Sequence, residues 1–169
     1  MICACVILAR LQSWDSQRAA STERCARVLM GVNMRFEIEI QTGKRDDFVD
    51  ITAQVRDCVR KSGVQDGICV VFVPHATAGL AVNENWDPSV TADTLATLDR
   101  LVPWRANYQH VEGNAAAHIK SALVGTSETL LVDAGNLVLG TWQGIFLAEF
   151  HGPRLRSVLI RVISDVKAG

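Results

Sequence analysis

The 169-residue sequence lacks the features that mark several large classes of protein. No apolar run approaches the roughly 20 residues that a membrane-spanning helix needs, so we expect no membrane partner. The formal net charge is −1, which leaves no excess of positive charge to attract a nucleic acid. We therefore expect neither nucleic-acid binding nor membrane insertion.

Cysteine pairs with the spacing of a metal or redox site are also missing. The five cysteines are odd in number, and none forms the C-x-x-C pattern of a zinc knuckle or a redox-active pair. Cys58 and Cys69 lie in apolar patterns and are expected to be small core residues. The apolar stretch at residues 1–10 has no positively charged start and no convincing cleavage site, so we do not expect a signal peptide. A reduced, cytoplasmic protein is predicted.

The length favours a single domain. Residues 1–33 show no sustained hydrophobic period and are interpreted as an N-terminal extension. Apolar and charged residues then alternate from Met34 to Ile40, which indicates a half-buried strand. The domain itself is therefore expected to span residues 34–169.

Short strands outnumber helices in the remaining pattern. We predict helices opening at Asp50 and at Asp87–Pro88, and a third over residues 115–123. The strands are expected at residues 34–40, 67–73, 80–82, 128–132, 137–150 and 156–163. This order predicts a β-rich α+β fold, mainly an antiparallel β-sandwich or distorted barrel with two or three helices.

Residues 108–118 contain two of the four histidines. Asn114 is expected to cap a helix that ends at Gly125, which places His118 on the first turn and His110 in the preceding loop. Imidazoles beside free helix N–H groups can bind a metal or an anion. The alternative for an isolated pair is that His118 packs and His110 is solvated.

Histidines and carboxylates elsewhere extend the set of candidate ligands. His75, His110, His118 and His151 are the candidate imidazoles, and Glu84, Asp133 and Glu149 are the candidate carboxylates. Three imidazoles from separate segments could bind zinc and leave a position open for water or substrate, whereas Mg²⁺ would prefer carboxylates and water. No serine lies in a nucleophile-elbow context, so a catalytic triad is not supported.

Two further segments carry polar groups near turns. Trp142 and Gln143 stand between Gly140 and Gly144, where a flat apolar ring and an amide could meet a ligand. The alternative is a core tryptophan beside an exposed strand residue. Arg154 and Arg156 could fork onto a phosphate or a carboxylate, although a surface salt bridge is the commoner arrangement.

Taken in order, these segments resemble the YjbQ-like family. The matching motifs are His75-Ala-Thr-Ala-Gly79, Asn83-Glu84, Tyr108-x-His110, Asn114-x-x-x-His118, Gly140-Thr-Trp-Gln143 and Glu149-Phe-x-Gly-Pro-Arg154. They cover roughly residues 34–163, and several separated motifs in order are far more specific than one. The chain departs from the family at His151, where aspartate is more usual.

The resemblance implies a homotrimer with sites near the subunit boundaries, and histidines gathered around a divalent metal or an anion. Members are often called secondary thiamine-phosphate synthases, which join hydroxymethylpyrimidine diphosphate to thiazole phosphate and release pyrophosphate. This is regarded as a side activity. The expected catalytic residues are His75, Glu84, His110, His118, Gln143, Glu149 and Arg154. The expected substrate-binding residues are Thr77, Asn83, Tyr108, Asn114, Lys120 and Trp142.

His75, His110 and His118 are the expected ligands of a metal such as zinc, and Mg²⁺ is a further candidate with the diphosphate substrate. Two other functions stay open at this point. One is a metal-dependent phosphoester hydrolase that uses a metal-bound water. The other is a non-catalytic trimeric protein that binds a metal or an anionic metabolite.

Overall fold

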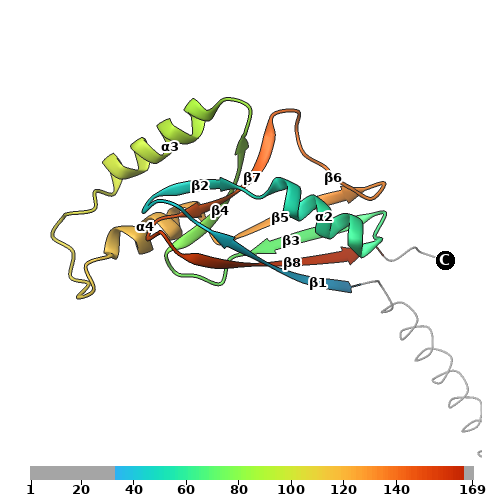
Figure 1. The fold of residues 1–169 in the computed structure, drawn as a ribbon, viewed down its shortest axis with the longest axis horizontal. Helices are drawn as coiled ribbons and strands as arrows, with labels where there is room; N and C mark the ends of the chain where they lie inside the picture. Colours follow the sequence, from blue (N-terminus) through green and yellow to red (C-terminus); the bar gives the residue numbers. More distant parts are fainter. Residues whose placement is uncertain (1–32, 166–169) are drawn as a thin grey trace, which may run out of the picture. The chain divides into compact units, whose positions relative to one another are not determined.

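The computed structural model describes residues 33–165 of the chain. The predicted extension at residues 1–33 lies outside the described residues except for Asn33, which begins the first strand. Within the described residues the helices are α2 (Thr52–Ser62), α3 (Pro88–Leu101) and α4 (Ala115–Val124). The strands are β1 (Asn33–Gln41), β2 (Asp47–Asp50), β3 (Gly67–Phe72), β4 (Ala78–Glu84), β5 (Ser127–Asp133), β6 (Asn136–Leu137), β7 (Gln143–Glu149) and β8 (Leu155–Ser164) (Figure 1).

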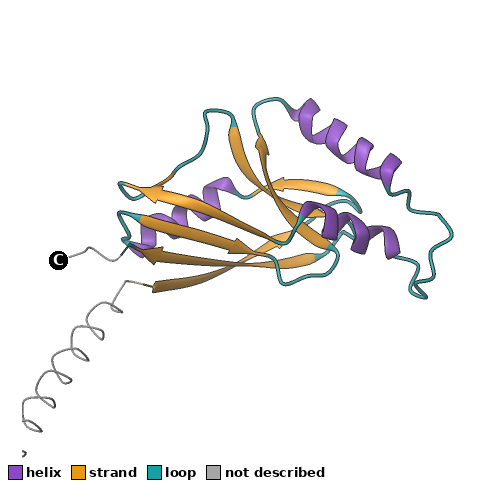
Figure 2. Cartoon of the chain, turned by 180° about the vertical axis from the view of Figure 1, so that it is seen from behind, coloured by secondary structure: helices purple, strands orange, loops and turns teal. Residues whose placement is uncertain are grey.

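The strands form two antiparallel sheets. The larger has the order β1-β8-β3-β5-β6, and the smaller has the order β2-β7-β4. All paired strands run antiparallel. Seen from behind, α3 stands to one side of the strands (Figure 2). The predicted fold class, β-rich α+β with mainly antiparallel strands and three helices, is confirmed. None of the described helices is long and apolar enough to cross a membrane.

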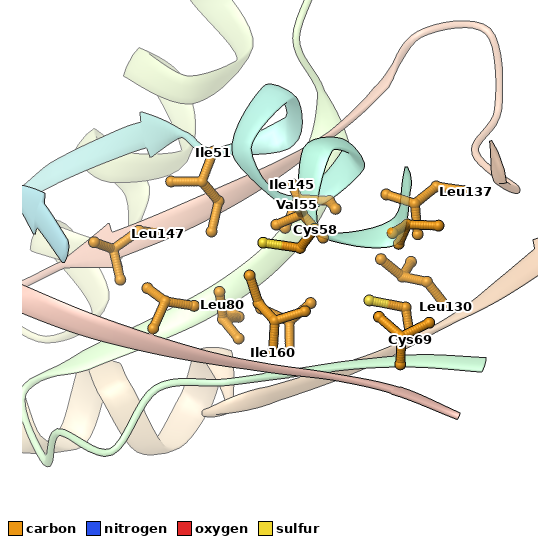
Figure 3. Close-up of a cluster of buried hydrophobic side chains, with 14 of the residues drawn as sticks. Ile51, Val55, Cys58, Cys69, Leu80, Leu130, Leu137, Ile145, Leu147 and Ile160 are labelled. Atoms are coloured by element: carbon orange, nitrogen blue, oxygen red, sulfur yellow. The ribbon is translucent and has the colours of Figure 1, made fainter. Parts of the chain in front are cut away.

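The main core lies between α2 and the inner faces of both sheets. Val55 and Cys58 on one stripe of α2 meet Ile145 and Leu147 of β7 and Ile160 of β8 (Figure 3). Each fully buried aliphatic side chain stabilises the fold by about 1.5–3 kcal/mol relative to an exposed one. The same contacts attach the smaller sheet to the larger one.

The predicted burial of two cysteines is confirmed. Both Cys58 and Cys69 are free thiols in this core. Burial raises the pKa of the Cys69 thiol to about 12. Because the thiolate is the reactive form, Cys69 acts as a small apolar residue.

The expected helix start at Asp50 is two residues early. Asp50 is the last residue of β2, a four-residue strand that is too short to show an alternating pattern, and α2 begins at Thr52. The Asp50 carboxylate still accepts a hydrogen bond from the Thr52 backbone N–H at 2.8 Å. Asp50 therefore supplies a capping contact from outside the helix.

The single strand expected over residues 137–150 is also wrong. Leu137 ends β6 in the larger sheet, whereas Gln143 begins β7 in the smaller one. A turn separates them, closed by the Gln143 N–H donating to the Gly140 carbonyl at 2.9 Å. Gly140 lies in this turn, where the chain passes from the larger sheet to the smaller one, whereas Gly144 lies within β7.

The ends of α3 and α4 agree with the sequence. Asp87 caps α3 by accepting from the Ser89 N–H at 2.8 Å, with Pro88 in the first turn. Asn114 and Gly125 flank α4 as expected. The Asn114 side chain makes no capping hydrogen bond, so its amide is directed to other partners.

Candidate functional site

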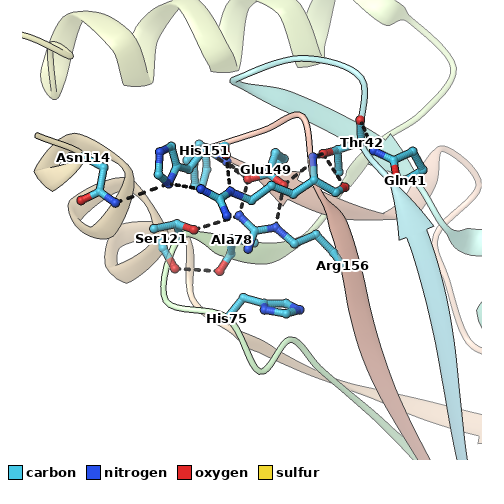
Figure 4. Close-up of polar contacts among 12 residues, drawn as sticks. Gln41, Thr42, His75, Ala78, Asn114, Ser121, Glu149, His151 and Arg156 are labelled. Atoms are coloured by element: carbon cyan, nitrogen blue, oxygen red, sulfur yellow. Dashed lines mark hydrogen bonds and ion pairs between the residues drawn. The ribbon is translucent and has the colours of Figure 1, made fainter. Parts of the chain in front are cut away.

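A buried ion pair lies beneath the polar end of β7. Glu149, the last residue of β7, is fully buried, and Arg156 of β8 is 5% exposed. The Arg156 guanidinium donates to both carboxylate oxygens of Glu149, from Nε to Oε2 at 2.6 Å and from Nη2 to Oε1 at 2.5 Å (Figure 4). Thr42 donates to Oε2 at 3.1 Å, and Arg156 Nη2 donates to Thr77 Oγ1 at 2.8 Å. The pair is therefore almost fully hydrogen-bonded, which a buried charge requires.

Opposing influences set the protonation of Glu149. Burial alone would raise the pKa of its carboxyl group. Hydrogen bonds from Arg156, the His151 N–H and Thr42 act the other way and hold the pKa below its ordinary value. Glu149 is thus a carboxylate at neutral pH, and its oxygens are already occupied.

The same carboxylate holds the turn that follows β7. Oε1 accepts from the backbone N–H groups of Phe150 at 3.0 Å and His151 at 2.8 Å. Thr42 Oγ1 accepts from the Arg154 N–H at 2.9 Å. A Cβ at Gly152 would lie 2.2 Å from the Lys44 carbonyl oxygen, so this close approach requires glycine. Hydrogen bonds to the side chains of Glu149 and Thr42 therefore hold the backbone of residues 149–154 in place.

His151 projects from this turn toward α4. Its Nδ1 lies 3.4 Å from Asn114 Nδ2 and 3.3 Å from Arg154 Nη2. Both neighbours are donors, so the network assigns Nδ1 as the acceptor of a neutral imidazole. Burial lowers the pKa of His151, and the positive charges of Arg154 and Arg156 lower it further.

Two more histidines stand beside this turn. The rings of His110 and His118 lie edge to face with centroids 5.1 Å apart. Asn114 Oδ1 is buried and has no hydrogen-bond partner among the described residues. We call His110, Asn114, His118, His151 and Arg154 the histidine cluster. An unsatisfied buried oxygen beside so many donors indicates a place for a polar ligand or water.

His75 does not join this cluster. Its Nε2 accepts from the Ser157 backbone N–H at 3.0 Å, and Figure 4 shows its ring apart from Asn114 and His151. Burial, followed by the charge of Arg156, lowers the pKa of His75. In residues 33–165 no three His, Cys, Asp or Glu side chains are placed to hold a metal ion. The three histidines expected as metal ligands therefore form no ligand group within one chain.

Four expected site residues lie at the other end of β7. Asn83 and Glu84 end β4, where Glu84 is opposite Gln143, and Trp142 precedes β7. At about 3.4 Å per residue, the six steps from Gln143 to Glu149 span about 20 Å. Trp142, 53% exposed, packs instead against Trp86 with ring centroids 5.4 Å apart. Within one chain these residues do not line the histidine cluster.

Lys120, expected to bind substrate, is buried in the structure and already paired. Lys120 is 1% exposed, and its Nζ donates to Asp46 at 3.1 Å and Asp99 at 2.9 Å. All of its charge is directed at these two carboxylates, which join α4 to the loop before β2 and to α3. Lys120 is a structural cation.

Tyr108 lies in the segment between α3 and α4. Its hydroxyl donates to the Pro103 carbonyl at 2.9 Å, which is a contact within the same loop. Sequence reasoning missed Thr42 and considered Arg156 only as an arginine near a turn, without pairing it with Glu149. A charged residue at an inward position of β8 was the available signal for Arg156, while Thr42 gave none.

Similarity to known proteins agrees with this architecture. The model of the family described as "UPF0047 protein YjbQ-like" matches residues 36–165, and the chain belongs to that family. The UPF0047 protein MJ1081 of Methanocaldococcus jannaschii is 48% identical over 137 residues, which are 81% of this chain and 99% of that protein. YugU of Bacillus subtilis is 44% identical over 127 residues, covering 75% of this chain and 96% of that protein.

Solved structures show the same fold. A YjbQ/UPF0047-family protein of Clostridium acetobutylicum is 50% identical with a TM-score of 0.75, covering 76% of this chain and 99% of that one. A YbjQ-like protein of Sulfolobus solfataricus is 34% identical with a TM-score of 0.76, covering 79% of this chain and 98% of that one. Both are described as uncharacterised or of unknown function. These relatives define the family and the fold.

Proposed function

We propose that the histidine cluster binds the phosphate of a small phosphorylated metabolite, and that the protein is a transferase with weak thiamine-phosphate synthase activity. The observation that carries the binding proposal is the placement of His151 and Arg154 beside the start of α4 by the buried Glu149. The reaction is proposed from the family resemblance alone. The two parts are separable by experiment.

The donor set favours an anion over a cation. Arg154 is exposed and contributes a guanidinium that can bind phosphate oxygens in pairs. Asn114 adds an amide, and backbone N–H groups at the start of α4 add partial positive charge. Glu149 faces Arg156 and offers no free oxygen to a metal. A single chain therefore fits a phosphate better than a resident metal ion, and no step below depends on a metal.

These groups suit the departure of pyrophosphate. Negative charge develops on the leaving oxygen, and preorganised donors stabilise it most where water is excluded. Arg154 would bind the diphosphate, and a protonated His151 would donate a hydrogen bond to it. Transfer of the pyrimidine carbon to the thiazole nitrogen requires no strong general base, in keeping with the lack of a triad.

A homotrimer in the cytoplasm completes the proposal. Trp142 and Gln143 lie about 20 Å along β7 from Glu149 of the same chain. In the proposed trimer, Trp142 and Gln143 of a second subunit would therefore line the histidine cluster. Association in a closed ring brings different surfaces of neighbouring subunits together. The binding of a divalent metal, such as zinc or Mg²⁺, stays a prediction at the level of this assembly.

The proposed reaction predicts that Arg154→Ala reduces product formation by about 10- to 100-fold. That range corresponds to the loss of one charge-assisted hydrogen-bonding group, about 1.5–3 kcal/mol. Purified protein would be incubated with both substrates and Mg²⁺, and thiamine phosphate quantified by chromatography. Arg100→Ala is the matched control, because Arg100 is exposed on α3 and contacts only Thr97.

Equal product from wild type and Arg154→Ala would contradict the assigned site. Binding of pyrophosphate without any product would favour the non-catalytic alternative. Release of phosphate from a phosphoester panel after chelation and re-metallation would favour the hydrolase. The last two outcomes each select one of the two alternative functions.

Pyrophosphate affinity is expected to rise as the pH falls from 8 to 5.5. The pKa of His151 lies below its ordinary value of 6.5, so the imidazole of the free protein is neutral at pH 8. The ring gains positive charge as the pH falls toward this lowered pKa. A cationic imidazole attracts the anion by its charge, whereas a neutral imidazole can only form a hydrogen bond with it. Isothermal titration at the two pH values measures the change.

His151→Asn separates this effect from the ionisation of the ligand and of the other histidines. The variant retains a polar side chain but cannot gain charge. Its affinity should change less between pH 8 and 5.5 than that of wild type. An identical pH dependence in both proteins would assign the effect elsewhere.

A further inference from the structure

The exposed side of α2 borders two hollows. One of about 600 Å³ lies between α2 and Asn85, the residue that follows β4. The other, of about 180 Å³, lies between α2 and the turn at Gly135 and Asn136 that leads into β6, the strand beside α2 in Figure 1. Arg56 and Arg60 line both hollows, which we call the α2 groove. Small-molecule sites commonly have volumes of about 300–1,000 Å³, so the larger hollow can hold a metabolite.

The two arginines of the α2 groove stand one helical turn apart. Residues four apart on a helix share a face, with Cβ atoms about 5–6 Å from each other. Both side chains are exposed, and like charges at this spacing repel each other. An anion between Arg56 and Arg60 would remove this repulsion and accept hydrogen bonds from both guanidinium groups.

The positive charge of the groove is largely uncompensated. Arg56 takes part in none of the ion pairs formed within residues 33–165. Arg60 Nη2 lies 3.2 Å from Asp57, but the same carboxylate is closer to Lys61, at 2.6 Å. Arg60 thus shares its partner with a second cation, and Arg56 has a free guanidinium.

The carboxylate that lines the larger hollow is already bound. Asp50 Oδ1 accepts from the Thr52 backbone N–H at 2.8 Å and from the Thr52 hydroxyl. Its Oδ2 accepts from Asn85 Nδ2 at 3.2 Å. Because both oxygens of Asp50 face other donors, the groove suits an anion rather than a cation.

Amide side chains complete the wall of the larger hollow. Asn85 is held in place by its bond to Asp50 and lies so close to β7 that a Cβ at Gly144 would be 2.7 Å from its Nδ2. Gln54, exposed on the first turn of α2, adds a second amide. A polar group that is fixed before binding loses little freedom when a ligand arrives.

We propose that the α2 groove is a second anion site, which binds a small metabolite through a phosphate or diphosphate group held by Arg56 and Arg60. Guanidinium groups bind phosphate oxygens in pairs, and a diphosphate carries enough charge for two of them. All residues of the groove come from one chain. The proposal therefore needs neither the histidine cluster nor a second subunit.

Calorimetric titration of Arg154→Ala with pyrophosphate at low ionic strength tests the α2 groove. This substitution removes the exposed guanidinium of the histidine cluster, so the binding that persists reports on the groove. About one pyrophosphate per chain is expected, and adding Arg56→Ala should weaken the affinity about 10-fold or more, as the loss of a charge-assisted hydrogen bond implies. Adding Arg100→Ala instead removes an equal charge from α3 and should leave the affinity unchanged.

A second variant and a spectroscopic signal locate the bound anion. Adding Arg60→Ala to Arg154→Ala should weaken the affinity by a similar factor. The side-chain Nε–Hε resonances of Arg56 and Arg60 should shift during the titration, while that of Arg100 stays in place. Circular dichroism verifies the fold of each variant, and none of these substitutions alters a buried side chain.

The outcomes separate this site from the proposed function. Loss of all pyrophosphate binding in Arg154→Ala alone would overturn the α2 groove, as would an affinity that Arg56→Ala and Arg60→Ala leave unchanged. Equal stoichiometry and affinity in wild type and Arg154→Ala, with weakening only by the α2 substitutions, would support the groove and contradict the histidine cluster. Two pyrophosphates per wild-type chain, each lost with its own arginine, would support both sites.

Discussion

Replacing Arg156 with leucine is expected to lower the free energy of unfolding by about 3–5 kcal/mol. The substitution leaves the fully buried Glu149 carboxylate without its cation, and an uncompensated buried charge is costly. For a domain of this size, the thermal midpoint should fall by roughly 10–15 °C. Urea unfolding followed by tryptophan fluorescence measures the loss.

Two controls separate the buried charge from a general effect of losing arginine. Arg60→Leu removes an exposed guanidinium that lies 3.2 Å from Asp57, and it should leave the unfolding free energy unchanged within error. The double variant Glu149→Leu with Arg156→Leu should be less destabilised than Arg156→Leu alone, because no charge is then stranded. A double variant that is less stable by the sum of both single losses would contradict this account.

The same pair predicts the direction of the acid response. The folded pKa of Glu149 lies below its unfolded value of about 4.5, so its contribution is complete above that pH. The contribution is lost as the pH falls through the lowered folded pKa. Arg156→Leu removes the largest cause of the lowered pKa, and the unfolding free energy of this variant should fall less steeply between pH 5 and 3.

Replacing Lys120 with methionine is expected to destabilise the protein by about 2 kcal/mol and to leave pyrophosphate affinity unchanged. The ammonium is 1% exposed between Asp46 and Asp99, whose side chains are 13% and 48% exposed. Breaking a fully buried pair costs about 3–5 kcal/mol, and the exposure of Asp99 reduces that value. Chemical unfolding and calorimetric titration of the same preparation give the two numbers.

Lys61→Met provides the matched comparison. Lys61 pairs with Asp57 on the surface of α2, with both side chains largely exposed, and should show no measurable change. If Lys120→Met instead retained full stability and lost pyrophosphate binding, the substrate role expected from the sequence would be correct and the structural role wrong.

Local chemistry in the sequence predicted the parts of the fold that depend on neighbours along the chain. Proline at the start of α3 and Asn114 and Gly125 around α4 set those helix ends, and alternation marked β1 and β8. The break between β6 and β7 was not predictable in this way. Gly140 signals a bend, but only the pairing shows that Leu137 and Ile145 belong to different sheets.

The same difference between local and long-range contacts decides which parts of the candidate site were predictable. His110, Asn114 and His118 were predicted together because one loop and one helix turn place them. The role of Lys120 depends on Asp46 and Asp99, which lie 74 and 21 residues away in the sequence. The roughly 20 Å between Gln143 and Glu149 follows from an unbroken β7, whose start at Gln143 the sequence pattern did not define.

The anchoring of the turn after β7 leaves the side chain at position 151 free to be exchanged. Its backbone N–H, rather than its side chain, is held by Glu149, and Arg154 is tied through its own N–H to Thr42. A change from aspartate to histidine there alters the local charge without moving the main chain. A substitution of this one side chain can therefore change which ligands this end of the molecule attracts while the backbone stays in place.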